Sequence, residues 1–188
     1  GDHNATNAAG VVALAGELGF DPFRAAAGVA AFTGTGRRFE HRGVAKGVSF
    51  IDDYAHHPTE VAATLAAASG WEGGRVVAVF QPHLYSRTQR LADRFGAALA
   101  VADVVVVTDV FAAREDPIEG VDGTLISAAA RRHGATDVVD APDRSTLVEV
   151  VAALIRPGDL VLTMGAGDVT AVAEELGAVL PGAVIETP

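Results

Sequence analysis

The chain has 188 residues, of which 49% are hydrophobic, which is enough for one sizeable core or for one domain and a fragment of another. A formal net charge of −10 disfavours nucleic acid and anionic membrane surfaces as partners, because both are themselves negatively charged. The chain has no cysteine, which excludes disulfides and thiolate metal sites, and no long apolar or signal-like segment. We therefore expect a cytoplasmic protein whose partners are small molecules, with neither nucleic acid nor a membrane among them.

The beginning of the chain has a helical pattern. Residues 4–18 are rich in alanine, carry apolar side chains at helical spacing and end at Gly19, a residue that often terminates helices. A second short helix is predicted for residues 22–31, and the glycines of "FTGTG" then interrupt the pattern. Because the character of the sequence changes between residues 33 and 38, we expect one part to comprise residues 1–36 and a separate domain residues 37–188.

The rest of the chain alternates short β-rich runs with amphipathic segments. Strands are predicted at residues 39–44, 48–52, 75–80, 104–108, 137–139 and 160–163, and helices at residues 58–69, 86–101, 124–133, 144–155 and 169–180. Several strands, such as "RVVAVF" and "VVVVT", are continuously apolar, as in a parallel sheet that is buried on both faces. The pattern predicts an α/β fold with a doubly wound, mostly parallel sheet flanked by helices, and an antiparallel edge formed by the first two strands.

Ligands of such sheets bind at the carboxyl ends of the strands, where four loops are unusual: "DDYAHHPTE", "QPHLYSRT", "DVFAARED" and "MGAGDV". In the first loop, Pro58 suits the first helical position and Glu60 the third, which predicts that His57 caps a helix. Asp53, Tyr54 and His56 precede this cap and are candidate ligand contacts. Adjacent histidines point apart, so chelation of a metal by His56 and His57 together is disfavoured and no metal site is expected.

The second loop offers a cation. Arg87 lies near the start of a predicted helix, where its planar guanidinium could bind a carboxylate or a phosphate. The alternative is that Arg87 is a solvated helix residue, as we expect for Arg90 and Arg94. Neither interpretation is favoured strongly by position alone.

Two nucleotide-binding motifs are not met. "MGAGDV" would need glycine at position 170 to match G-x-G-x-x-G, but Thr170 stands there, and we expect Asp168 to be the N-cap of the following helix. No G-x-x-x-x-G-K-[ST] occurs, and the only lysine, Lys46, is followed by Gly47. The 188 residues of this chain therefore contain no phosphate-binding P-loop.

The order of the segments "GDHNATNAAG", "GTGRRFE", "DDYAHHPTE", "FQPHLYSRT", "DVFAARE" and "GAGDV" closely resembles the Mur ligases of peptidoglycan synthesis. The resemblance implies an ATP-dependent amide ligase of three domains, of which this chain is the end of the central ATP-binding domain, to residue 36, and a complete Rossmann-like carboxyl-terminal domain. It further implies that ATP and Mg²⁺ are held mainly by the part that precedes this chain, and that the fragment alone is inactive.

The resemblance also implies roles for individual residues. It assigns no catalytic residue and no metal ligand to this chain. The positions that match family residues around the nucleotide are His3, Asn4, Asn7, Arg38 and Asp53, with the first three near adenine and Asp53 at the ribose. An alternative role for Asn4 is the N-cap of the first helix.

The positions that match the pocket for the amino-acid substrate are Tyr54, His56, His83 and Arg87. Arg87 is the best candidate for binding the substrate carboxylate. The sequence departs from the family pattern at Leu84, where an arginine is frequent, and in "DVFAARE", where Phe111 and Arg114 replace a tyrosine and a glycine. The role of that loop, including Glu115, therefore does not follow from the resemblance.

Within the family, these motifs imply a ligase that joins L-alanine to UDP-N-acetylmuramate through an acyl phosphate. Two alternatives remain. A muropeptide-recycling ligase would attach a preformed tripeptide to the same sugar acid, and a nucleotide-binding regulatory module would use the fold without the reaction.

Overall fold

A computed structural model describes residues 2–32 and 34–180, with side chains from residue 4 onward. The chain divides into two compact units, Gly1–Thr35 and Gly36–Pro188. No helix among the described residues is both long enough and apolar enough to cross a membrane.

The first unit is a pair of helices, α1 (Asp2–Glu17) and α2 (Pro22–Ala30). Asp21 starts α2 by accepting a hydrogen bond of 2.8 Å from the backbone N–H of Phe23. Both helices were predicted from the sequence, but α1 begins before Asn4. Asn4 therefore lies inside the helix, and its alternative role as an N-cap is wrong. No described side chain of this unit is fully buried, so the two helices have no core of their own.

The second unit is built on one six-stranded sheet. Its strands are β1 (Glu40–Ala45), β2 (Val48–Asp53), β3 (Val76–Phe80), β4 (Val104–Thr108), β5 (Val138–Ala141) and β6 (Leu160–Met164). They lie in the order β1-β2-β6-β3-β4-β5, with β1 antiparallel to β2 and every other neighbouring pair parallel. The expected doubly wound sheet with an antiparallel edge is confirmed.

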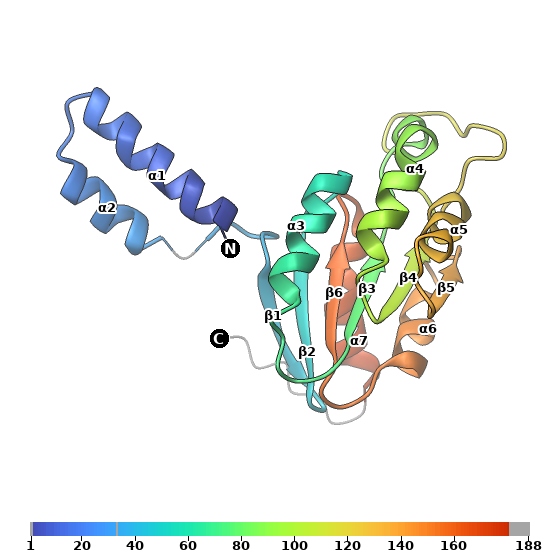
Figure 1. Ribbon diagram of the computed structural model, residues 1–188. Helices are drawn as coiled ribbons and strands as arrows, with labels where there is room; N and C mark the ends of the chain where they lie inside the picture. Colours follow the sequence, from blue (N-terminus) through green and yellow to red (C-terminus); the bar gives the residue numbers. More distant parts are fainter. Residues whose placement is uncertain (1, 33, 181–188) are drawn as a thin grey trace. The chain divides into compact units, whose positions relative to one another are not determined.

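Helices cover both faces of this sheet (Figure 1). One face carries α3 (Pro58–Ala68), α4 (Tyr85–Leu99) and α5 (Thr124–Arg132), and the other carries α6 (Leu147–Leu154), the 3₁₀ turn η1 (Asp168–Ala171) and α7 (Val172–Val179). Every residue of β2, β3, β4 and β6 is buried, which explains why β3 is continuously apolar, and β4 and β6 nearly so, rather than alternating. The α/β, Rossmann-like expectation is therefore correct.

Two helix starts differ from the sequence prediction. The helix expected from residue 144 begins at Leu147, because the Asp143 carboxylate accepts hydrogen bonds from the backbone N–H and the hydroxyl of Ser145 and so holds a turn. Asp168 is not the N-cap of the last helix. Gly167 precedes η1, and the Asp168 side chain instead accepts a bond of 2.6 Å from Gln81 Nε2.

Candidate functional site

The four loops singled out in the sequence meet at one edge of the sheet. They follow β2, β6, β3 and β4, which are parallel neighbours, so their carboxyl ends lie side by side. Backbone bonds join them directly: Gly165 N–H donates to Asp53 O at 3.2 Å, Gln81 N–H to Met164 O at 2.9 Å, and Phe111 N–H to Pro82 O at 2.8 Å. The expectation of a common rim is confirmed.

The second half of "DDYAHHPTE" starts a helix, as predicted. His57 is the N-cap of α3, and its Nδ1 accepts a hydrogen bond of 3.4 Å from Thr59 N–H. Glu60 reaches back, and its Oε2 accepts bonds from the backbone N–H groups of His57 at 3.1 Å and His56 at 3.0 Å. These contacts fix the loop that carries Tyr54 and His56.

The four residues assigned to the amino-acid pocket lie together, and we call them the His-Arg cluster: Tyr54, His56, His83 and Arg87. The ring of His56 lies edge-on to Tyr54 at 5.1 Å and to His83 at 5.8 Å between centroids. Nη1 of Arg87 donates to the carbonyl oxygen of His56 at 3.2 Å and lies 3.4 Å from Nδ1 of His83. All four side chains are half-buried, so the cluster is packed against the domain and still open to solvent.

The charge of this cluster suits an anion. Burial lowers the pKa of His83, the neighbouring Arg87 and then His56 lower it further, and Glu115 opposes the shift. His83 is therefore neutral near pH 7, and Arg87 carries the positive charge. Among the described residues, Arg87 forms its hydrogen bonds through Nη1, which leaves Nε and Nη2 for a bidentate contact with a carboxylate.

Asp53 has a different environment from the one its predicted role suggests. It is 7% exposed, and both oxygens already accept backbone bonds of 2.8 Å, Oδ1 from Ala55 N–H and Oδ2 from Phe39 N–H. These bonds order the turn after β2. Each carboxylate oxygen has a second lone pair, which is what remains for a ribose hydroxyl.

Three of the other predicted nucleotide contacts are exposed. Arg38 is exposed, and its guanidinium carbon lies 5.6 Å from the centre of the Tyr54 ring. Asn4 and Asn7 are exposed on α1, three residues apart and therefore on one face of that helix. The backbone of His3 is part of α1, but its side chain lies outside the described residues.

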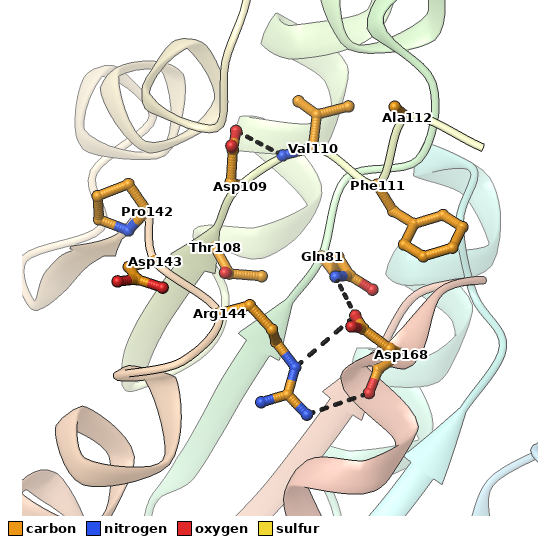
Figure 2. A pocket seen from close by; sticks show the side chains of 10 residues that line it. All are labelled: Gln81, Thr108, Asp109, Val110, Phe111, Ala112, Pro142, Asp143, Arg144 and Asp168. Carbon is orange, nitrogen blue, oxygen red and sulfur yellow. Dashed lines mark hydrogen bonds and ion pairs between the residues drawn. The ribbon is translucent and has the colours of Figure 1, made fainter. Parts of the chain in front are cut away.

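A second feature of this edge is a cavity of about 430 Å³ (Figure 2). Its lining comes from the loops after β3, β4, β5 and β6: Gln81, Thr108, Asp109, Val110, Phe111, Ala112, Pro142, Asp143, Arg144 and Asp168. Phe111 stands on the opposite side of the cavity from Pro142 and Asp143, and its ring is stacked on His83 at 5.9 Å. The cavity and the His-Arg cluster are therefore neighbours, separated by Phe111.

Sequence reasoning missed several residues that organise this edge. Arg144 donates to Glu175 Oε2 at 2.9 Å and to the carbonyl oxygen of Asp168 at 3.3 Å. Glu115 accepts bonds from the Ser86 hydroxyl at 2.5 Å and its N–H at 2.9 Å, which lower the pKa of Glu115 and secure the start of α4. The signal for Arg144 was its place after a strand. The loop of Glu115 was singled out in the sequence, but its contact with Ser86, 29 residues away, has no local sequence signal.

The described residues contain no group of three or more histidine, aspartate or glutamate side chains arranged to hold a metal ion. The resemblance assigns Mg²⁺ mainly to the part of the ligase that precedes these residues.

The fold and the site together define a Rossmann-like α/β domain that gathers candidate ligand-binding groups at the carboxyl edge of a mostly parallel sheet. Comparison with known proteins identifies the group. Residues 37–167 match the family described as "Mur ligase, glutamate ligase domain". This match covers more than half of the chain, and the chain belongs to the Mur ligase family.

Individual relatives agree with this. The UDP-N-acetylmuramate–L-alanine ligase of Thermobifida fusca is 52% identical over 179 residues, which cover 90% of this chain and 37% of that protein. The crystal structure of the UDP-N-acetylmuramate-alanine ligase of Thermotoga maritima has a TM-score of 0.75 at 29% identity, covering 94% of this chain and 37% of that one. A murein peptide ligase of Psychrobacter arcticus, at 23% identity, shares the fold with a TM-score of 0.74 over 99% of this chain and 38% of its own. The chain thus spans little more than a third of the length of these proteins.

Proposed function

We propose that this chain is the carboxyl-terminal part of an ATP-dependent ligase that joins L-alanine to UDP-N-acetylmuramate in peptidoglycan precursor synthesis. The observation that carries the proposal is the His-Arg cluster, where one half-buried guanidinium with unused donors lies beside a neutral imidazole. That arrangement suits the carboxylate of a small amino acid. The 52% identity to a ligase named for L-alanine supports the same substrate.

Residues 1–36 are, in this proposal, the end of the central ATP-binding domain, and residues 37–188 are the carboxyl-terminal domain. Two observations support the division. The family match begins at residue 37, and no described side chain of the first unit is fully buried, as expected of a piece separated from its own core. We propose that the chain is inactive alone, because the P-loop belongs to the preceding part.

The reaction would proceed in two steps. The muramic acid carboxylate attacks the terminal phosphorus of ATP, which gives an acyl phosphate and ADP. The amine of alanine then attacks the acyl carbon, and the tetrahedral intermediate collapses to the amide and inorganic phosphate. Mg²⁺, held mainly by the preceding domain, neutralises phosphate charge when it is bound.

The residues of this chain contribute by binding and orienting the amino acid. Arg87 binds the alanine carboxylate through Nε and Nη2, while Tyr54, His56 and His83 line the pocket and fix the direction of the amine. Orientation of two reactants contributes at most about 7–11 kcal/mol to lowering a barrier. The positive charge of Arg87 also excludes alanine bound in the reverse direction, because its ammonium would face the guanidinium.

A separate set of residues binds the nucleotide in the proposed enzyme. His3, Asn4 and Asn7 contact adenine, Arg38 contacts the nucleotide near the domain junction, and Asp53 accepts a hydrogen bond from ribose. Because ATP is a substrate, we place the reaction in the cytoplasm.

The test uses the full-length enzyme that contains this chain. It is incubated with ATP, UDP-N-acetylmuramate and either L-alanine or a tripeptide, and the amide product is identified by mass spectrometry together with the release of ADP. We expect the alanine amide to form, and the isolated chain to form none. If the full-length enzyme forms an amide with the tripeptide but not with L-alanine, the proposal is replaced by a recycling ligase. If the full-length enzyme forms no amide and the isolated chain binds ATP tightly, a regulatory module is favoured.

A further inference from the structure

Arg37 forms an ion pair with a carboxylate that has no contact with solvent. Its Nε lies 2.8 Å from Oδ2 of Asp52, which is 0% exposed. The other oxygen, Oδ1, accepts a bond of 2.8 Å from the hydroxyl of Thr163, and Oδ2 accepts a second bond of 2.7 Å from the hydroxyl of Thr170. Asp52 is therefore buried and hydrogen-bonded to protein groups through both oxygens, so it acts as a fixed counter-charge rather than as a ligand contact.

The same arginine joins two loops of the candidate site. Its Nη2 donates to the carbonyl oxygen of Gly165, in the loop after β6, at 2.6 Å. Its own carbonyl oxygen accepts a bond of 2.8 Å from Tyr54 N–H, in the loop after β2. Arg37 holds a φ of 59°, which an L-residue adopts only when its surroundings compensate the strain. The bonds to Asp52 and Gly165 supply that compensation.

The contact that leads to the amino-acid pocket is the one with the ring of Tyr54. The guanidinium carbon of Arg37 lies 5.0 Å from the ring centre, within the range of a cation–π interaction. The guanidinium carbon of Arg38 lies 5.6 Å from the centre of the same ring, and the centre of the His56 ring lies 5.1 Å from it. Arg37 thus contacts both the backbone N–H and the ring of Tyr54.

We propose that Arg37 is a positioning residue for the amino-acid step. Its hydrogen bonds to Asp52 and Gly165 fix the guanidinium against the Tyr54 ring. The position of that ring in turn fixes the position of His56 in the His-Arg cluster. Arg37 does not touch either substrate. The proposal rests on the proposed function and deepens it, because a residue outside the alanine pocket would set the positions of the side chains inside it.

The test separates the two chemical steps in the full-length enzyme. Hydroxylamine traps the acyl phosphate as a hydroxamate and releases phosphate, and it has no carboxylate for the pocket to bind. Arg37→Lys keeps one positive donor but cannot reach Asp52 and Gly165 with a planar fork. We expect the KM for L-alanine to rise about tenfold, and hydroxamate formation and the KM for ATP to stay within about twofold.

Two further variants complete the design. Arg37→Ala removes the cation as well, so its KM for alanine should exceed that of Arg37→Lys. The matched control is Arg42→Ala, five residues along the chain, where a half-exposed arginine lies 3.6 Å from Glu40; its kinetics should equal those of the parent enzyme.

An unchanged alanine KM in both Arg37 variants would overturn the proposal. So would a parallel loss of hydroxamate and amide formation, since that pattern indicates a purely structural role, including failure to fold. The parent enzyme distinguishes this result from a failure of the proposed function: if the parent itself forms a hydroxamate but no alanine amide, the substrate assignment is wrong whatever Arg37 does.

Discussion

Nη1 of Arg87 lies 3.4 Å from Nδ1 of His83, so a permanent positive charge adjoins a half-buried imidazole. A guanidinium can only donate, and the contact therefore requires the proton of neutral His83 to be on Nε2. Burial is the larger cause of the lowered His83 pKa, and Arg87 is the next. The pair keeps one positive charge in the cluster instead of two.

This relationship predicts a measurable titration. The C–H resonances of His83, followed by NMR between pH 4 and pH 8, should give a pKa below the ordinary histidine value of about 6.5. Arg87→Ala should raise that pKa without restoring the ordinary value, because burial remains. A His83 pKa at or above the ordinary value in the unaltered chain would contradict the assigned electrostatics.

The direction of the accompanying effect on stability follows from linkage. Unfolded His83 binds its proton at the ordinary pKa, whereas folded His83 binds it only at lower pH. Between those two values the unfolded state holds more protons, so His83 lowers the free energy of unfolding as pH falls through that window. Above the ordinary pKa the effect vanishes. The effect is measured by comparing the urea midpoints of the parent chain and His83→Gln at pH 5 and pH 8. Relative to the parent chain, the stability of His83→Gln should be higher at pH 5 than at pH 8.

The second prediction concerns the carboxylate of alanine. In the full-length enzyme, Arg87→Ala removes the guanidinium whose Nε and Nη2 are proposed to bind it, so the KM for alanine should rise by about 10²-fold, as for loss of a bidentate charged contact of about 3 kcal/mol. The KM for ATP should change little. Steady-state kinetics with each substrate varied in turn give both values.

The control for this substitution is Arg90→Ala. Arg90 is exposed on the same helix, α4, three residues further along, and we expect no change in either KM. Equal effects of the two substitutions would mean that Arg87 contributes only general positive charge, and an unchanged alanine KM for Arg87→Ala would remove it from the pocket.

A third prediction follows from the two backbone bonds of Asp53. Asparagine has one acceptor oxygen, so in Asp53→Asn either Phe39 N–H or Ala55 N–H faces an amide group instead of a carboxylate. We expect the free energy of unfolding to fall by about 1–3 kcal/mol. Urea denaturation followed by the fluorescence of Trp71, the only tryptophan, reports on the second unit. Asp143→Asn is the control, because exposed asparagine caps a turn as well as aspartate does and the change should be below about 0.5 kcal/mol.

The same substitution separates two roles of Asp53 in the full-length enzyme. If Asp53 also binds ribose, as proposed, Asp53→Asn should weaken ATP binding at temperatures where the variant is fully folded. Normal nucleotide titration by a folded variant would limit Asp53 to its structural role in the turn after β2.

What the sequence predicted well were features with local causes. The continuous apolar runs of β3 and β4 follow from burial on both faces, and the cap of α3 follows from His57, Pro58 and Glu60 within four positions. The meeting of the loops that carry Tyr54 and His83 followed from topology, because parallel neighbouring strands end at one edge. The sequence therefore predicted the fold and the meeting of these loops, whereas an amino-acid pocket formed by the His-Arg cluster stays a prediction.

What it could not predict were contacts between distant positions. Asp52 reads like Asp53 in "DDYAHHPTE", yet the pleat sends the two side chains to opposite faces of the sheet, one to Arg37 and one to the turn. Asp168 was expected to cap a helix, but its carboxylate accepts a hydrogen bond from Gln81, which is 87 residues away. A side chain's partner across the sheet depends on strand order, which no single loop encodes.

The last prediction tests how the helices on one face are packed. A methyl group added at Gly96 of α4 would lie 2.5 Å from the carbonyl carbon and 2.6 Å from the next nitrogen of α5, at Ala129 and Ala130. Backbone atoms cannot yield as a flexible side chain can, so Gly96→Ala must move one helix away from the other. We expect a loss of about 1–3 kcal/mol in the free energy of unfolding, although alanine alone favours a helix over glycine by about 1 kcal/mol.

The matched substitution for this measurement is Gly70→Ala, which has open space within 4 Å of the added methyl group and no positive φ. It should leave stability unchanged or raise it by up to about 1 kcal/mol, since alanine restricts the unfolded chain. Both variants are compared by urea denaturation with Trp71 as the probe. Equal midpoints for Gly96→Ala and the parent chain would show that α4 and α5 are further apart than in this structure, and would leave Gly96 without a packing role.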